Sequence, residues 1–167
     1  ALWFNIVSDE SDVHYAVTQL AIDYRDLHEA IGTDTTAAVA ADPQKAVEAQ
    51  AYHKLDRPYL GIKVPQIEEL TDQWRADCTL DDRIHLASDL WDTNIHEARV
   101  AAAKLLTQAR LKPDDTTAWD LICRWVPQFD AWAIADHVCI AAQKRITADP
   151  TRIDTVETWT THENMWT

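Results

Sequence analysis

Trp132 and Asp136 stand four residues apart in an apolar segment that is predicted to be helical, so their side chains share one helix face. A carboxylate on such a segment is costly unless it is solvated, paired or functional. An indole face attracts positive charge, and a carboxylate stabilises a cation that develops beside it. The pair would therefore suit a cationic guest. The motif is weak by itself, and ordinary core packing is the alternative.

Other catalytic chemistries find little support in the sequence. Two His-Glu pairs, at 28–29 and 96–97, begin the zinc pattern H-E-x-x-H, but a glycine and a valine replace its second histidine. No G-x-S-x-G elbow occurs, and apolar neighbours make Cys123 and Cys139 typical core residues. Two glycines are too few for a phosphate-binding loop. We expect no metal, and we expect the histidines to be surface or hydrogen-bonded residues.

The chain has 15 Lys+Arg and 28 Asp+Glu, and its formal net charge of −13 argues against a generic nucleic-acid or anionic membrane surface. The charge is uneven. Residues 1–44 contain eight acidic residues and one basic residue, whereas residues 98–145 contain seven basic and five acidic residues. The second region would allow a basic strip, which beside the Trp–Asp pair would suit a nucleic-acid enzyme whose reacting centre becomes positive. Adaptation to salt would give the same acidic excess.

The length of 167 residues suits a single domain, and 47% hydrophobic residues are enough to bury a core. No apolar run approaches the ~20 residues that cross a bilayer, and the first residues lack the basic flank of a secretory signal. Three cysteines without a CxxC pair favour a reducing compartment. We therefore expect a cytoplasmic protein.

Apolar residues at three- and four-residue steps predict helices nearly throughout and no convincing strand. We predict an all-α fold of about eight helices in antiparallel pairs, as a HEAT-like right-handed solenoid (an alpha-alpha superhelix). Residues 1–42 would form an acidic N-terminal helix and residues 43–167 the core of the single domain. The helices are expected from Ser11 to Ile31, at 43–54, from Pro65, and at 79–91, 94–110, 113–126, 130–146 and 150–159.

Polar residues directly before these segments predict where several helices begin. Asp42, Thr79, Asp130 and Asp149 are each expected to cap a helix N-terminus. Among the eight tryptophans, Trp119 and Trp125 are well placed to fill the core.

Three segments and the C-terminal stretch together resemble the DNA alkylation repair family of HEAT-like glycosylases. The resemblance covers about residues 45–167, and the order and spacing of the motifs carry it. The motifs are a tyrosine-to-LGI loop at 52–65, an LW…E.R..A..LL helix pair at 90–106, a W-x-x-x-D element at 129–136 and a W…S.N.W stretch at 159–166.

This resemblance implies hydrolysis of the N-glycosidic bond of positively charged N3- or N7-alkylpurines in duplex DNA. Asp136 would stabilise the oxocarbenium-like sugar and help to position the attacking water, and Trp132 would pack against the deoxyribose. No cofactor and no membrane partner are implied, and a monomer is expected. The residues that we expect to bind substrate and DNA are Tyr52, Trp166, Lys54, Arg57, Lys63 and Arg99.

The chain also departs from the family pattern. The family has an arginine three residues after the tryptophan that corresponds to Trp166, and the sequence ends at Thr167. We expect a fragment of a longer protein, with a degenerate family member as the alternative. Two other functions stay open: a non-catalytic HEAT-like scaffold that binds protein partners, and a catalytically inactive binder of DNA structures.

Overall fold

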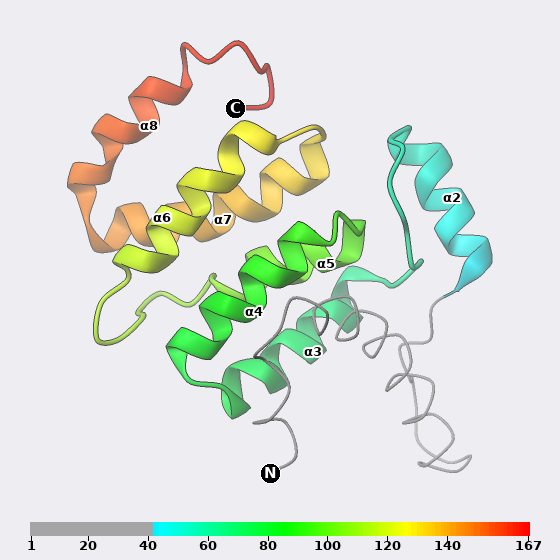
Figure 1. Cartoon of the computed structure of the whole chain (residues 1–167), viewed down its shortest axis with the longest axis horizontal. Coiled ribbons are helices and arrows are strands. Elements are labelled where there is room, and N and C mark those ends of the chain that lie inside the picture. The colour runs from blue at the N-terminus through cyan, green and yellow to red at the C-terminus, as the bar shows by residue number, and fades with distance from the viewer. Residues whose placement is uncertain (1–41) are drawn as a thin grey trace.

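The computed structural model describes residues 42–167, so the predicted acidic N-terminal helix lies outside the described residues. The described part is all-α, as predicted, with seven α-helices, two short 3-10 helices and no strand (Figure 1). No helix in this part is long and apolar enough to span a bilayer. The helices are α2 (Pro43–His53), α3 (Val64–Asp77), α4 (Leu80–Asp92), α5 (His96–Leu105), α6 (Thr116–Trp125), η1 (Val126–Gln128), α7 (Trp132–Ala148), η2 (Pro150–Arg152) and α8 (Ile153–Trp159).

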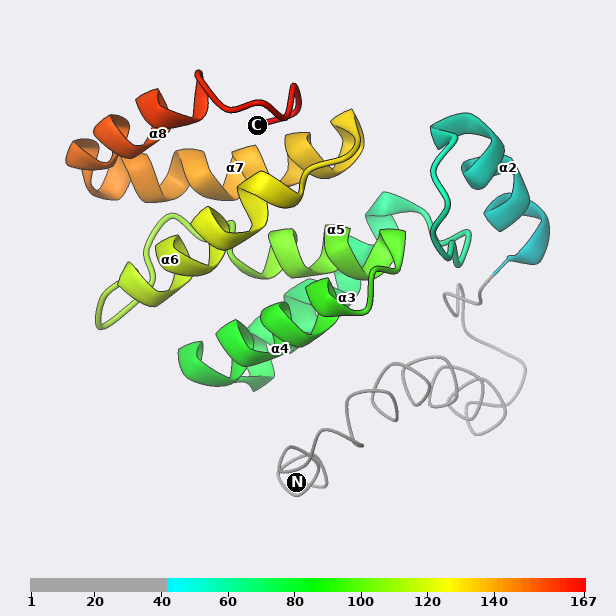
Figure 2. The same ribbon diagram turned by 45° about the horizontal axis from the view of Figure 1, so that its top comes forward.

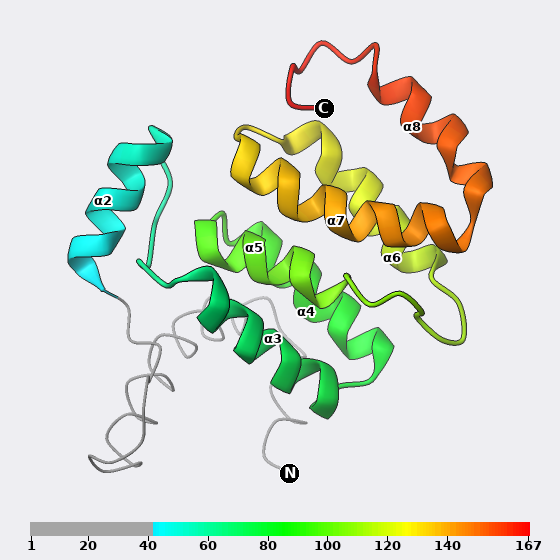
Figure 3. The same ribbon diagram turned by 180° about the vertical axis from the view of Figure 1, so that it is seen from behind.

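The helices from α3 to α7 form two layers. In one layer α5 lies between α3 and α7, and in the other α4 packs beside α6 (Figure 3). Across the layers α4 packs on α5, and α6 packs on α7. Short connections return the chain in the opposite direction from α3 to α4 and from α6 to α7 (Figure 2). The right-handed solenoid stays a prediction.

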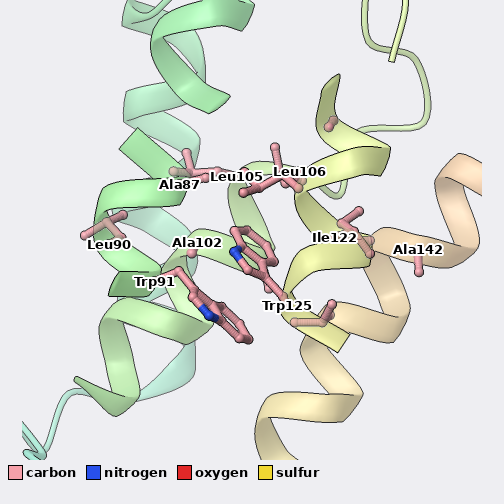
Figure 4. Close-up of a cluster of buried hydrophobic side chains, with 14 of the residues drawn as sticks. Ala87, Leu90, Trp91, Ala102, Leu105, Leu106, Ile122, Trp125 and Ala142 are labelled. Atoms are coloured by element: carbon pink, nitrogen blue, oxygen red, sulfur yellow. The ribbon is translucent and has the colours of Figure 1, made fainter. Parts of the chain in front are cut away.

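The hydrophobic core lies between the two layers (Figure 4). Trp91 and Trp125 are buried there with their rings stacked, 4.5 Å between centroids. The small side chains of α5 let its neighbours approach closely, as at the fully buried Ala102. Trp119 is also buried, so both predicted core tryptophans are confirmed. The aliphatic residues of this cluster include Ala87, Leu90, Leu105, Leu106, Ile122 and Ala142.

Three of the four predicted N-caps are confirmed. The side chains of Asp42, Thr79 and Asp149 accept hydrogen bonds from backbone N–H groups in the first turns of α2, α4 and η2. The fourth prediction was wrong. Ala131 is the N-cap residue of α7, and the Asp130 carboxylate forms an ion pair with a distant arginine instead.

The predicted helix at 94–110 ends at Leu105. The reason is partly tertiary, because the carbonyl oxygen of Lys104 accepts a hydrogen bond from the distant guanidinium of Arg75 as well as one from the nearby Thr107 hydroxyl, both at 2.9 Å. These side chains satisfy a carbonyl that a further helical turn would otherwise use.

Two further predictions need correction. The helix expected from residue 113 begins at Thr116, whose N–H donates to the Asp114 side chain. Cys139 is exposed rather than part of the core, because α7 buries a different face, which includes Val138 and Ala142. Cys123 is half-buried and packs against the core, as expected.

Candidate active site

Trp132 and Asp136 lie on the first two turns of α7. The helix buries Ala133, Ile134 and Ala135 against the core, which leaves its opposite face for the indole and the carboxylate. Trp132 is 48% exposed and Asp136 is also exposed. Within residues 42–167 the Asp136 carboxylate has neither an ion pair nor a hydrogen bond. An accessible and uncompensated negative charge therefore stands one helical turn from an accessible aromatic face.

The end of α2 brings a second exposed aromatic ring to Trp132. Tyr52 is 66% exposed, and its ring meets the Trp132 ring edge-on with 6.3 Å between centroids. The His53 ring lies 5.9 Å from the same indole. In Figure 1 this end of α2 faces the start of α7. The structure thus brings together three of the predicted site residues, Tyr52, Trp132 and Asp136, from two distant segments.

An imidazole pair lies behind the exposed rings. The centroids of His53 and His96 are 4.5 Å apart, and the ring of Tyr59 stacks on both. Burial, with smaller contributions from His53 and Arg57, lowers the pKa of His96 to about 4. Burial also lowers the pKa of His53. Both imidazoles are consequently neutral near pH ~7, so they place no competing cation beside Trp132.

The expectation that every histidine is a surface or hydrogen-bonded residue was wrong for His96. It is buried, and its Nδ1 atom has no hydrogen-bond partner in the described part of the chain. The spacing of the histidines in the sequence gives no sign of this cluster, because α2, the following connection and α5 contribute one residue each.

The structure places Arg57 and Arg99 in the interior rather than on the rim. The Arg57 guanidinium donates to Asp130, and Arg99 Nη1 lies 4.0 Å from the same carboxylate. Arg99 Nε also donates to the Trp91 carbonyl at 3.2 Å, and its guanidinium lies 4.6 Å from the centroid of that indole. Burial lowers the pKa of both arginines, that of Arg99 to about 10. Both cations are therefore engaged inside the protein and do not belong to the proposed DNA-contacting residues.

Lys54 and Lys63 are exposed at the two ends of the connection between α2 and α3. Neither ammonium group forms an ion pair with any residue that the structure describes. These two lysines therefore remain available to an external anion.

Trp166 is exposed on the C-terminal segment, which folds back onto the connection between α6 and α7 (Figure 1). The backbone N–H of Trp166 donates to Asn164 Oδ1 at 3.0 Å, and Asn164 Nδ2 donates to the Phe129 carbonyl at 2.7 Å. This segment is thus fastened to the residues that directly precede Trp132.

Glu97 is a site-supporting residue whose contacts the sequence did not predict, although it occurs in the incomplete zinc pattern and is the glutamate of the LW…E.R..A..LL motif. It is buried in the first turn of α5, and its carboxylate oxygens accept hydrogen bonds from the N–H groups of Leu60 and Gly61 at 2.9 and 2.8 Å. This bidentate contact fixes the connection that follows α2. No group of three or more His, Cys, Asp or Glu residues among residues 42–167 is arranged to hold a metal ion.

Comparison with known proteins gives one family. The model of the family described as DNA alkylation repair enzyme matches residues 36–167, which include every helix described above. Comparisons with curated proteins and with solved structures give no match.

Proposed function

Because the chain belongs to the DNA alkylation repair enzyme family, we propose that it hydrolyses the N-glycosidic bond of positively charged N3- and N7-alkylpurines in duplex DNA. The family gives a role in DNA repair. The observation that carries the finer proposal is the exposed pair of Trp132 and Asp136, whose carboxylate is unpaired among the described residues. An indole and a free carboxylate side by side favour a reacting centre that is cationic.

The reaction follows from where the charge moves. When the bond between the sugar C1′ and the purine breaks, its electron pair neutralises the alkylated base, and positive charge develops on the deoxyribose. The Asp136 carboxylate stabilises that charge and orients a water molecule for attack at C1′, and it accepts the proton that the water loses. The products are a free alkylpurine and an abasic site.

The neighbouring residues have supporting roles in this proposal. The rings of Trp132 and Tyr52 attract the cationic lesion and its sugar through their π-faces. Lys54 and Lys63 bind backbone phosphates, and Trp166 contributes a further DNA contact. The protein acts on DNA as a monomer in the cytoplasm and uses no cofactor.

Product analysis tests the proposal. The protein is incubated with duplex DNA that contains 7-methylguanine, and both the released bases and the strand are examined. We expect free 7-methylguanine and an unbroken strand with an abasic site. Restoration of guanine in the strand would instead indicate dealkylation. Salt-dependent DNA binding without base release would indicate an inactive DNA binder, and no DNA binding would indicate a protein scaffold. Each of these three results overturns the proposal.

A further inference from the structure

The helix that carries Tyr52, α2, does not pack any buried side chain against the rest of the protein. None of the residues of α2 is buried. The connection 54–63 runs back beside the helix (Figure 2), and the Asp42 N–H donates to the Leu60 carbonyl at 2.9 Å. Residues 42–63 therefore form one unit, whose position depends on the contacts that its connection makes.

The polar contacts of this unit reach two different parts of the molecule. At the start of α5, the His96 N–H donates to the Pro58 carbonyl at 3.1 Å. Glu97 on α5 accepts hydrogen bonds from the backbone N–H groups of residues 60–61. The Arg57 guanidinium donates to Asp130, which lies two residues before Trp132. The ion pair thus links the connection after Tyr52 to the chain that leads directly into α7.

Because Arg57 is buried, its guanidinium depends on this ion pair to compensate its positive charge. Its side chain is 2% exposed, and its Nε and Nη1 atoms have no hydrogen-bond partner within residues 42–167. Asp130 therefore supplies the one negative charge that compensates this guanidinium among the described residues. A buried cation without its partner is strongly unfavourable and would turn outward to water. Since Arg57 follows Tyr52 by five residues, such a movement would carry α2 away from α7.

We propose that Asp130 is a positioning residue, which holds the exposed ring of Tyr52 beside Trp132 through its ion pair with Arg57. It acts on the reaction through these partners. The kinetic consequence of this inference rests on the proposed glycosylase function, whereas its structural consequence does not.

The test compares Asp130→Asn, which keeps the shape and removes the charge, with Asp115→Asn. Asp115 is a matched control, because its carboxylate lies 2.7 Å from Arg152 and 3.3 Å from Arg145 at the opposite end of α7. Amide hydrogen exchange across residues 42–63 is measured on the whole chain. We expect about tenfold faster exchange in Asp130→Asn and no change there in the control.

Single-turnover excision of 7-methylguanine gives the second readout. We expect Asp130→Asn to slow excision about tenfold in the wild-type background and by less than about twofold in a Tyr52→Ala background. A general loss of stability would slow excision equally in both backgrounds. Equal effects, or unchanged exchange in residues 42–63, would overturn the inference.

Two further results remain decisive. If the wild type releases no 7-methylguanine, the proposed function fails, and hydrogen exchange alone decides whether Asp130 holds α2. If Asp130→Asn does not fold, Arg57→Gln replaces it, because that change removes the buried cation and leaves an Asp130 side chain that is 39% exposed to water. The same faster exchange is expected, and protection equal to that of the wild type would refute the inference.

Discussion

The candidate site separates charged from neutral groups by their burial. The Asp136 carboxylate is exposed and has no ion-pair partner among the described residues, whereas the imidazoles of His53 and His96 lie deeper and are neutral near pH ~7. The arginines that approach the site are turned inward to Asp130. Apart from the exposed Lys54 and Lys63, the groups that a cationic lesion would meet here are therefore an anion and aromatic faces.

The indole of Trp132 should contribute through its face as well as through its bulk. We expect Trp132→Ala to slow excision of 7-methylguanine by roughly 3- to 30-fold, in line with the strength of cation–π contacts, and Trp132→Phe to retain part of the rate. Single-turnover assays at saturating enzyme measure this difference. Trp159→Phe is the control, because Trp159 packs against Trp119 on another helix. If Trp132→Ala is as active as the wild type, the indole has no role in the reaction.

Burial of His96 should make the folded state sensitive to acid. Its folded pKa of about 4 lies below the ordinary value of 6.5, so the unfolded chain binds the extra proton. Stability is therefore complete above about pH 6.5 and falls as the pH approaches about 4. We expect His96 to account for a loss on the order of 2 kcal/mol in the free energy of unfolding between about pH 7 and about pH 5.

Urea denaturation of the wild type and His96→Gln at these two pH values measures the effect. The variant should show a smaller difference between the two pH values, because its side chain does not titrate. An equal difference in both proteins would assign the acid sensitivity to other groups, such as His53 and His137, whose pKa values are also lowered by burial.

Among the elements, α7 supplies the reacting groups and the unit of residues 42–63 supplies the opposing aromatic ring. The unit closes tightly at Gly61, whose φ of 73° is unfavourable for other residues. A Cβ atom at this position would collide with the Asp42 carbonyl oxygen and lie 2.7 Å from Ala46 N. The return of the connection along α2 therefore requires glycine.

We expect Gly61→Ala to destabilise this unit by about 1–3 kcal/mol and to leave the α3–α7 layers folded. Limited proteolysis should then cut within residues 42–63 at lower protease concentrations than in the wild type. Gln50→Ala, on the exposed face of the same helix, is the control and should not change the cutting. Equal resistance of Gly61→Ala would mean that the connection tolerates a side chain there.

At the level of elements, the sequence predicted what depends on local spacing. The caps at Asp42, Thr79 and Asp149 and the shared face of Trp132 and Asp136 follow from residues a few positions apart. The predictions were wrong where a residue far away in the chain determines which partner a side chain binds. Asp130 has the chemistry of a helix cap, but Arg57 captures its carboxylate from a segment far away in the chain.

Distant partners also explain why the sequence did not predict the interior positions of Arg57 and Arg99. Sequence reasoning treats every basic residue near a binding segment as a surface cation, and it cannot show that Arg99 lies over the Trp91 ring. The neutral state of His96 likewise depends on burial by three separate segments. Tertiary burial, rather than local pattern, decides the charge of these groups.

The whole molecule combines a net charge of −13 with a site that is proposed to bind DNA. Exposed lysines near the site must then provide a local attraction that the net charge opposes. The affinity for duplex DNA should fall steeply with salt, and Lys54→Ala and Lys63→Ala should each reduce the slope of log K against log salt by about 1.

Fluorescence anisotropy with duplex DNA over a range of salt concentrations measures this slope. Lys45→Ala is the matched control, because Lys45 lies on α2, the helix that Lys54 follows, and is already paired with Asp42. A slope that none of the three substitutions changes would place the DNA on another face of the molecule.

The central claim is that the Asp136 carboxylate stabilises the positive charge of the reacting sugar. The most direct test is the single-turnover rate of 7-methylguanine release by Asp136→Asn, compared with Asp154→Asn, an exposed aspartate on α8. We predict a loss of roughly 10²–10³-fold for Asp136→Asn and no loss for Asp154→Asn. A wild-type rate in Asp136→Asn would contradict the account.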